Sequence, residues 1–206
     1  MSYYIRTMTK EDLPEVTEID REAFPTQWPP ADYGYEFKNR MAHYVVACDS
    51  GASVAPPEKK ESLGAWLSRV LGRKVPQDGP SVDRHYIVGF AGFWVMAGEA
   101  HVTSIAVREK YRRRGIGELL LVAVTELAIG LKADFVTLEV RASNSPAQSL
   151  YTKYGFNRVG ERKAYYLDRR PSGDSREDAV IMTTDNIQSR DFQDKLQRLK
   201  ETITAK

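Results

Sequence analysis

The sequence predicts an α/β fold of the α+β kind, with a central sheet of about six to seven strands flanked by helices. Three observations support this class. Runs rich in β-branched and aromatic residues alternate along the chain with runs whose apolar residues recur at helical spacing. A strand–turn–strand pattern over residues 86–107 is typical of a hairpin. The 206 residues, 42% hydrophobic and 28% charged, are enough for one domain with a buried core.

The chain is expected to begin with a strand over residues 3–8 and a helix that ends near Phe24. Thr9 and Asp12 stand three residues apart, as in a capping box at a helix start. The residues at helical spacing are Leu13, Val16, Ile19 and Ala23. The prolines in 24–30 end this helix, because proline removes a donor and restricts the residue before it. An aromatic and proline-rich loop is therefore predicted.

A second helix over about 31–41 and a strand over 43–48 follow. Residues 49–84 differ in composition, with Ser, Gly, Pro and Lys-Glu runs at both ends. They predict an insertion that carries one short amphipathic helix. Its apolar residues are Leu63, Trp66, Leu67, Val70 and Leu71.

The hairpin comes next, with strands over 86–95 and 100–107 and a turn at Ala97-Gly98-Glu99. A basic, glycine-containing loop then leads into a helix over about 117–132, which is followed by a strand over 135–141. The apolar face of that helix consists of Leu120, Ala123, Val124, Leu127 and Leu131.

A short helix over 146–154 should begin after Asn144, a good N-cap, and stop at Gly155. Strands over 157–166 and 178–184 flank a polar loop from Asp168 to Asp178. We expect one main domain over residues 1–187, with the insertion inside it, and a C-terminal amphipathic helix over 188–206. The apolar residues of that helix are Phe192, Leu196, Leu199 and Ile203.

Composition excludes several classes of protein. The 30 Lys and Arg residues nearly balance the 28 Asp and Glu residues, so the net charge of +2 gives no reason to expect nucleic acid as a partner. No apolar run approaches the ~20 residues needed to cross a bilayer, and no signal-peptide pattern is present, so we expect a cytoplasmic protein without a membrane partner. The single cysteine, Cys48, cannot form an internal disulfide or a cysteine-built metal cluster. It is interpreted as a buried strand residue, with a reactive thiol as the alternative.

The basic loop has the outline of an anion site. The first N–H groups of a helix lack internal partners and carry the positive end of its dipole, so an anion is stabilised there. Glycines at 115 and 117 allow close approach of the backbone, and neighbouring arginines add charge. The loop lacks the Lys-Ser/Thr ending of a Walker loop and the three glycines of a dinucleotide fingerprint. A solvated basic turn or a nucleic-acid patch remains an alternative, although no aromatic platform is interleaved with the arginines and the net charge is low.

The stretch from Val107 to Leu121 resembles the acetyl-CoA loop of the GNAT acyltransferases. The preceding "HVTSIAV" resembles the strand before that loop. The later "VTLEVRASNSPAQSLYTKYGFNRVGERKAYY" is similar to the RimI branch, whose members acetylate protein N-terminal amines. The resemblance covers roughly residues 3–48 and 85–187 and is most specific from 101 to 166. It implies the GNAT fold, with a mixed, mostly antiparallel sheet, and an acetyltransferase that uses acetyl-CoA.

The resemblance also implies a cofactor site. Backbone groups of Ile105, Ala106 and Val107 would bind the pantetheine arm and the acetyl carbonyl. Asn144 matches the position that contacts the cofactor beside the thioester. The residues that would surround the pyrophosphate are Arg112, Arg113, Arg114, Gly115, Ile116, Gly117 and Glu118.

Two residues match the family's catalytic positions. Glu139, which points away from its apolar strand neighbours by two-residue alternation, matches the general base; a solvated strand residue is the alternative. Tyr151 matches the general acid that protonates the thiolate, with a core aromatic as the alternative. Its reference pKa of ~10 exceeds the ~8.5 of a thiol, so this transfer needs help from the site. His101 is a rival base. His43 and His85 show no ligand spacing, and no metal is expected.

The acceptor is expected to be the N-terminal α-amine of a protein, with a ribosomal protein as one candidate. An α-amine has a reference pKa of ~7.7–8.0 against ~10.4 for lysine, so it is more often neutral near pH 7. By resemblance, Phe24 and Trp28 line one wall of the peptide groove, and Tyr165 and Tyr166 line the other; packing of the first two onto the core is the alternative.

Three rival functions stay open from the sequence. The same chemistry could act on a small-molecule amine or a lysine side chain. The chain could also be a CoA-binding module without catalysis, or a nucleic-acid-binding protein. We expect a monomer or a weak homodimer.

Overall fold

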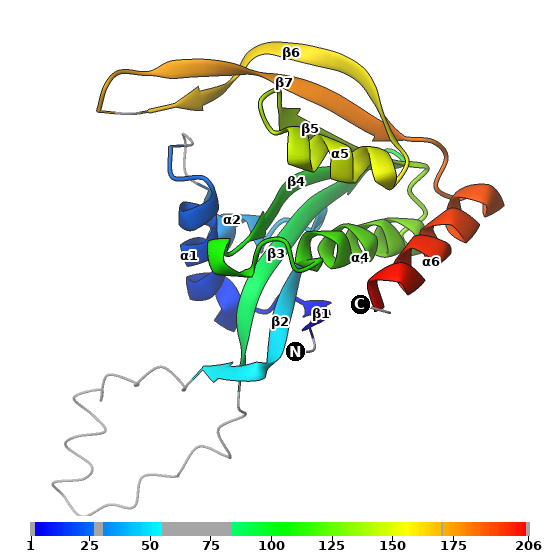
Figure 1. Cartoon of the computed structure of the whole chain (residues 1–206), viewed down its shortest axis with the longest axis horizontal. Helices are drawn as coiled ribbons and strands as arrows, with labels where there is room; N and C mark the ends of the chain where they lie inside the picture. The colour runs from blue at the N-terminus through cyan, green and yellow to red at the C-terminus, as the bar shows by residue number, and fades with distance from the viewer. Residues whose placement is uncertain (1–2, 27–30, 55–83, 170, 205–206) are drawn as a thin grey trace, which may run out of the picture.

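The computed structural model describes residues 3–26, 31–54, 84–169 and 171–204. They form one seven-stranded sheet with the order β1-β2-β3-β4-β5-β7-β6 (Figure 1). The strands are β1 (Tyr3–Thr7), β2 (Ala42–Val54), β3 (Arg84–Met96), β4 (Glu99–Val107), β5 (Phe135–Arg141), β6 (Phe156–Asp168) and β7 (Ser175–Thr184). Five neighbouring pairs are antiparallel and the β4–β5 pair is parallel. The predicted fold class, a mixed and mostly antiparallel sheet flanked by helices, is confirmed.

Five α-helices and two 3-10 turns accompany the sheet in the described residues. They are η1 (Lys10–Asp12), α1 (Leu13–Ala23), α2 (Tyr33–Glu36), η2 (Glu109–Tyr111), α4 (Ile116–Gly130), α5 (Ser145–Lys153) and α6 (Arg190–Thr204). None of the helices described has the length and apolar character that crossing a bilayer requires.

Helices α1 and α4 cover opposite faces of the β1–β4 part of the sheet. Val45 and Ala47 of β2 belong to the core that α4 fills, whereas Val46 and Cys48 belong to the core that α1 fills. Consecutive strand residues point to opposite faces, so each core receives one set of side chains. Cys48 is buried, as the sequence predicted. The C-terminal α6 adds its apolar face to the α4 core, where Phe192 and others are buried.

The β3–β4 hairpin turns through two residues in the left-handed region, Ala97 (φ 51°) and Gly98 (φ 82°). Such two-residue turns match the twist of the strands that they join. Further along β4, Gly92 pairs with Ser104 and Phe93 with Val102, which leaves Thr103 as a bulge.

The bulge reverses which residues of β4 face α4. Ala100 and Val102 lie in the α4 core before it, and Ile105 and Val107 pack against the same core after it. The ladder between β4 and β5 runs only from Glu99↔Phe135 to Val102↔Leu138, so it stops just before the bulge.

The structure corrects three predicted boundaries. The helix expected over 31–41 is confined to α2, because Asn39 forms a turn that leads into β2, accepting bonds from Met41 N at its side chain (3.0 Å) and from Ala42 N at its carbonyl (3.1 Å). The insertion expected from residue 49 begins later, since β2 continues to pair with β3 as far as Val54↔Arg84. Its predicted short helix lies outside the described residues. The loop predicted over 168–178 is shorter, because β6 and β7 are paired as far as Asp168↔Ser175.

Gly92 provides a test of the packing between β2 and β3. A Cβ atom there would lie 2.2 Å from the ring of Tyr44, which is buried against Tyr33 and hydrogen-bonded to Glu36. Gly92→Ala should therefore lower the free energy of unfolding by about 1–3 kcal/mol, as overpacking does, measured by urea denaturation.

The matched control for Gly92→Ala is Gly130→Ala, at the end of α4, where an added Cβ meets nothing within 4 Å. This change should leave stability unchanged or raise it by up to about 1 kcal/mol, because alanine is the better helix former. Equal stability of the two variants would contradict the packing argument.

Candidate active site

A buried carboxylate and an imidazole meet where the β4–β5 ladder ends. Glu139 lies between Leu138 and Val140, whose side chains fill the α4 core, so its own side chain emerges on the opposite face. It is nevertheless only 7% exposed, because Nε2 of His101 lies 3.1 Å from its Oε2 and Nε of Arg162 lies 3.0 Å from its Oε1. His101 pairs with Thr137, two residues before Glu139, and therefore shares this face.

The pair changes the protonation of both partners. The hydrogen bond from His101 holds the pKa of the Glu139 carboxyl below its ordinary value, although burial acts against this. The hydrogen bond to Glu139 raises the pKa of His101 above its ordinary value of 6.5, again against burial. Glu139 is therefore ionised at neutral pH, and a proton that the pair takes up resides on the imidazole. The sequence raised Glu139 and His101 as rival bases, and the structure places them in contact.

Two tyrosines lie beside this pair. The rings of Tyr165 and Tyr166 are in edge contact, with centroids 5.1 Å apart. The hydroxyl of Tyr166 donates to the backbone carbonyl of Glu139 (2.9 Å), and Arg141 lies over the Tyr166 ring at 4.4 Å. The aromatic wall predicted from the sequence is therefore joined to β5 at Glu139.

The start of the α1–α2 connection is tied to the end of β6. Thr26 donates its hydroxyl to Asp168 (3.0 Å) and accepts the amide of Arg169 at its carbonyl (3.0 Å). Arg141 holds the same Asp168 at 2.7 Å. Phe24 packs against the α1 core, as the packing alternative expected. Trp28 lies outside the described residues.

The start of α4 has the backbone geometry of an anion site. Gly115 is its N-cap in the left-handed region (φ 81°), and Arg113 also has a positive φ of 64°. Within the part of the chain that is described, no side chain caps this helix start. The amides of Ile116, Gly117 and Glu118 therefore face away from the helix without a capping side chain. The Glu118 carboxylate is instead paired with Lys153 of α5 (2.9 Å).

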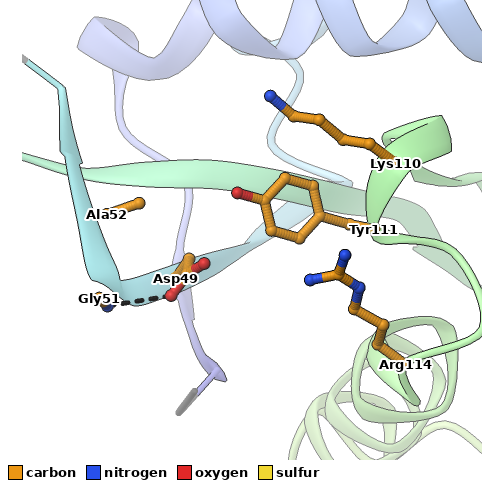
Figure 2. Close-up of a pocket in the computed structure, with 6 residues that line it drawn as sticks. All are labelled: Asp49, Gly51, Ala52, Lys110, Tyr111 and Arg114. Carbon is orange, nitrogen blue, oxygen red and sulfur yellow. Dashed lines mark hydrogen bonds between the residues drawn. The ribbon is translucent and has the colours of Figure 1, made fainter.

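The arginine side chains of this loop have contacts within the protein. Arg112 donates Nε to the carbonyl of Val107 (3.3 Å). Arg114 donates to the hydroxyl of Tyr3 (3.3 Å) and lies 4.9 Å from the centre of the Tyr111 ring. Figure 2 shows Arg114 and Lys110 on either side of Tyr111, at the edge of a pocket of about 330 Å³. The pocket is lined by Asp49, Gly51, Ala52, Lys110, Tyr111 and Arg114.

Helix α5 covers the start of α4. Asn144 caps α5 by accepting the amide of Ala147 at its side-chain oxygen (3.2 Å), which confirms the predicted helix start. An added Cβ on Gly117 would lie 3.8 Å from Leu150. Tyr151 is partly buried against Phe156, and burial raises the pKa of its phenol to about 12.

The expected site residues therefore fall into two groups. The groups around Glu139, His101 and the two tyrosines lie together on the face opposite to α4. The start of α4 and the last part of β4, from Ile105 to Val107, form the second group. The β4–β5 ladder ends at Val102↔Leu138, before this part of β4. The link between His101 and Glu139 could be found from the sequence only by assuming the parallel pairing of β4 and β5.

Comparisons with known proteins agree with this arrangement. The profile of the "Acetyltransferase (GNAT) family" matches residues 13–156. An N-alpha-acetyltransferase of Saccharolobus solfataricus is 44% identical over 183 residues, covering 87% of this chain and 91% of that protein.

Two solved structures share the fold. The ribosomal-protein-S18-alanine N-acetyltransferase of Escherichia coli has a TM-score of 0.65 at 24% identity, covering 90% of this chain and 94% of the other. Arabidopsis thaliana NAA60 in complex with acetyl-CoA has a TM-score of 0.65 at 19% identity, covering 89% and 98%.

Histidine titration followed by NMR tests the pair directly. His101 should titrate above 6.5 because of Glu139, whereas burial should hold the pKa of His43 below 6.5. Because the pKa of folded His101 is raised, the protonated imidazole stabilises the fold below pH 6.5 and this contribution is lost as pH rises through the raised value. It is also lost in acid, as pH falls through the lowered pKa of Glu139. Glu139→Gln should lower the pKa of His101 and leave His43 unchanged. An unshifted His101 in that variant would rule out the pairing in solution.

Proposed function

Because the chain belongs to the Acetyltransferase (GNAT) family, we propose that it transfers an acetyl group from acetyl-CoA to the N-terminal α-amine of a protein. The observation that carries this proposal is the contact of the buried Glu139 carboxylate with the half-buried His101 imidazole, 3.1 Å apart, at the point where β4 and β5 cease to pair. The N-alpha-acetyltransferase of S. solfataricus supports the choice of acceptor. The E. coli enzyme acts on a ribosomal protein by its name, so a ribosomal protein is a reasonable first candidate.

In the proposed reaction the amine nitrogen attacks the acetyl carbonyl carbon, the C–S bond breaks, and CoA leaves as a thiolate. The amine proton passes to the Glu139–His101 pair, directly or through one water. Glu139 alone is a poor acceptor for it. Its pKa is lowered by the hydrogen bond from His101, far under that of an α-ammonium at ~7.7–8.0, so proton transfer from the amine to Glu139 is uphill. The pKa of His101, which Glu139 raises above 6.5, is much closer to that of the amine. We therefore assign acceptance of the proton to His101, and orientation of the His101 ring to Glu139.

Tyr151 is the proposed donor to the leaving thiolate. Its pKa of about 12 lies above the ~8.5 of a thiol, so the transfer is uphill unless bound cofactor changes the environment of the phenol. Proton donation by Tyr151 should therefore contribute less to the rate than proton acceptance by His101. A thiolate that leaves without a proton is the alternative for this step.

Acetyl-CoA is proposed to lie along the second group of residues. Its pantetheine arm would bind backbone groups of β4 from Ile105 to Val107. Its pyrophosphate would bind the amides at the start of α4, with Gly115 allowing the close approach. Arg112 and Arg114 already have partners in the protein, so their side chains should contribute less than these amides. Within the described ranges, no cluster of His, Cys, Asp and Glu could hold a metal ion.

An α-amine is favoured over lysine for two reasons. Its lower pKa suits a base of the strength of His101. The contact of Thr26 with Asp168 also joins the α1–α2 connection to the β6–β7 hairpin, beside the tyrosine wall. A small-molecule amine remains the second acceptor class. The Glu139 carboxylate, 7% exposed, argues against a CoA-binding module without catalysis, because a buried charge is costly to keep.

The acceptor test uses acetyl-CoA with a panel of peptides that carry a free N-terminus, including the N-terminus of ribosomal protein S18. Controls are the same peptides with a blocked N-terminus and one internal lysine, and small amines. The free N-terminal peptides should gain one acetyl group by mass spectrometry. His101→Gln and Glu139→Gln should each lower kcat/KM at least about a hundredfold, the usual range for a general base.

Acetylation confined to lysine or to small amines would contradict the proposed acceptor. Binding of CoA without acetylation of any acceptor would contradict the enzyme itself. A loss in Glu139→Gln with none in His101→Gln would return the base role to Glu139.

Gly115→Ala tests the cofactor site. The left-handed conformation costs a residue with a Cβ roughly 1–2 kcal/mol, so the loop should leave its binding geometry. The Kd for CoA should rise at least about fivefold by calorimetry. Gly130→Ala, at the other end of the same helix, is the control and should bind CoA like the parent chain. An unchanged Kd in Gly115→Ala would place the pyrophosphate elsewhere.

A further inference from the structure

The β6–β7 hairpin contains an irregularity beside the site. Arg162 of β6 pairs with Ala179 of β7, and Tyr166 pairs with Glu177. Three residues of β6 therefore stand opposite the single residue Asp178. Such a bulge leaves part of the longer strand outside the ladder and redirects its side chains.

The carboxylate of Asp178 binds this bulge at two points. Its Oδ1 accepts the backbone amide of Ala164 at 2.9 Å, and its Oδ2 accepts the ammonium of Lys163 at 2.7 Å. Arg176 adds a bond to the carbonyl of Ala164 (3.0 Å). Asp178 is itself fixed, because its backbone carbonyl accepts the amide of Ala142, just after β5 (3.0 Å).

The backbone conformation of Ala164 requires stabilising contacts. Its φ of 52° lies in the left-handed region, which costs a residue with a Cβ roughly 1–2 kcal/mol. An exposed ion pair such as that of Asp178 with Lys163 contributes little on its own. The bond from Asp178 to the Ala164 amide is different, because it satisfies the backbone group that the bulge removes from the ladder.

The bulge decides where Tyr165 lies. Consecutive residues of a regular strand point to opposite faces, yet the rings of Tyr165 and Tyr166 are only 5.1 Å apart. Tyr165 is thereby brought to the side of Tyr166, whose hydroxyl binds the backbone of Glu139. Its ring also lies 5.8 Å from the guanidinium of Arg162, which binds the Glu139 carboxylate. At 47% exposure, Tyr165 presents an open aromatic surface beside the Glu139–His101 pair.

We propose that Asp178 is a positioning residue for the acceptor: by holding the bulge at Ala164 it places Tyr165 against the first residues of the incoming chain. The inference rests on the proposed function for the identity of the acceptor. Asp178 should affect acceptor binding rather than the chemical step, because its side chain contacts Lys163 and Ala164 and, within the described residues, neither Glu139 nor His101.

Steady-state kinetics with the best acceptor of the panel test this role. Asp178→Ala should raise the KM for the acceptor about tenfold, with kcat and the KM for acetyl-CoA within about twofold of the parent values. Asp178→Asn keeps an oxygen for the Ala164 amide and loses only the charge, so its KM for the acceptor should lie close to the parent value. Asp174→Ala is the matched control, since that carboxylate pairs with Arg169 at the hairpin tip (3.9 Å). It should behave like the parent chain.

A double-mutant cycle separates positioning from stability. If Asp178 acts through Tyr165, Asp178→Ala should add little to the KM once Tyr165→Ala is present. The same tenfold rise in both backgrounds would overturn the proposal, as would a fall in kcat that Asp178→Asn does not recover.

A readout without turnover keeps the two proposals distinguishable. In NMR spectra, the ring-current shifts between Tyr165 and Tyr166 should be lost in Asp178→Ala and kept in Asp178→Asn and Asp174→Ala. If no peptide is acetylated but these shifts change as expected, the acceptor assignment fails, while the role of Asp178 in placing the Tyr165 ring stands. Unchanged shifts in Asp178→Ala would overturn the positioning role whatever the acceptor.

Discussion

The site depends on one constraint in the sheet, the end of the parallel ladder between β4 and β5 at Val102↔Leu138. Up to this pair the two strands are held by their backbones. Beyond it, the bulge at Thr103 reverses the facing of β4, so that Ile105 and Val107 continue to pack against the α4 core. Residues 105–107 of β4 thus lie beyond the end of the β4–β5 ladder, beside the start of α4.

The same end of the ladder places an acid–base pair on the other face. His101 and Glu139 come from neighbouring strands, and Glu139 lies two residues beyond Thr137, the register partner of His101. Their contact makes the carboxylate a stronger acid and the imidazole a stronger base than either would be alone. In the proposed reaction this difference favours the imidazole as acceptor of the amine proton, with the carboxylate orienting the imidazole and stabilising the charge that it gains.

Two of the arginines in the loop before α4 have partners within the protein. Arg112 and Arg114 contact Val107 and the tyrosines Tyr3 and Tyr111. What the loop offers is backbone geometry: a left-handed Gly115 and a helix start without a capping side chain in the described residues. A dipole and free amides are fixed in direction, whereas long cationic side chains find partners in the protein.

The sequence by itself determined the strands, the helix starts and the candidate residues Glu139 and Tyr151, because periodicity, capping and a family pattern are local or colinear signals. Only the tertiary structure decided that His101 contacts Glu139, that α2 is short, and that Asp178 binds the bulge of β6 beside Tyr165. These depend on strand register and bulges, which are set by pairing between segments far apart in the chain, and no local pattern records that pairing.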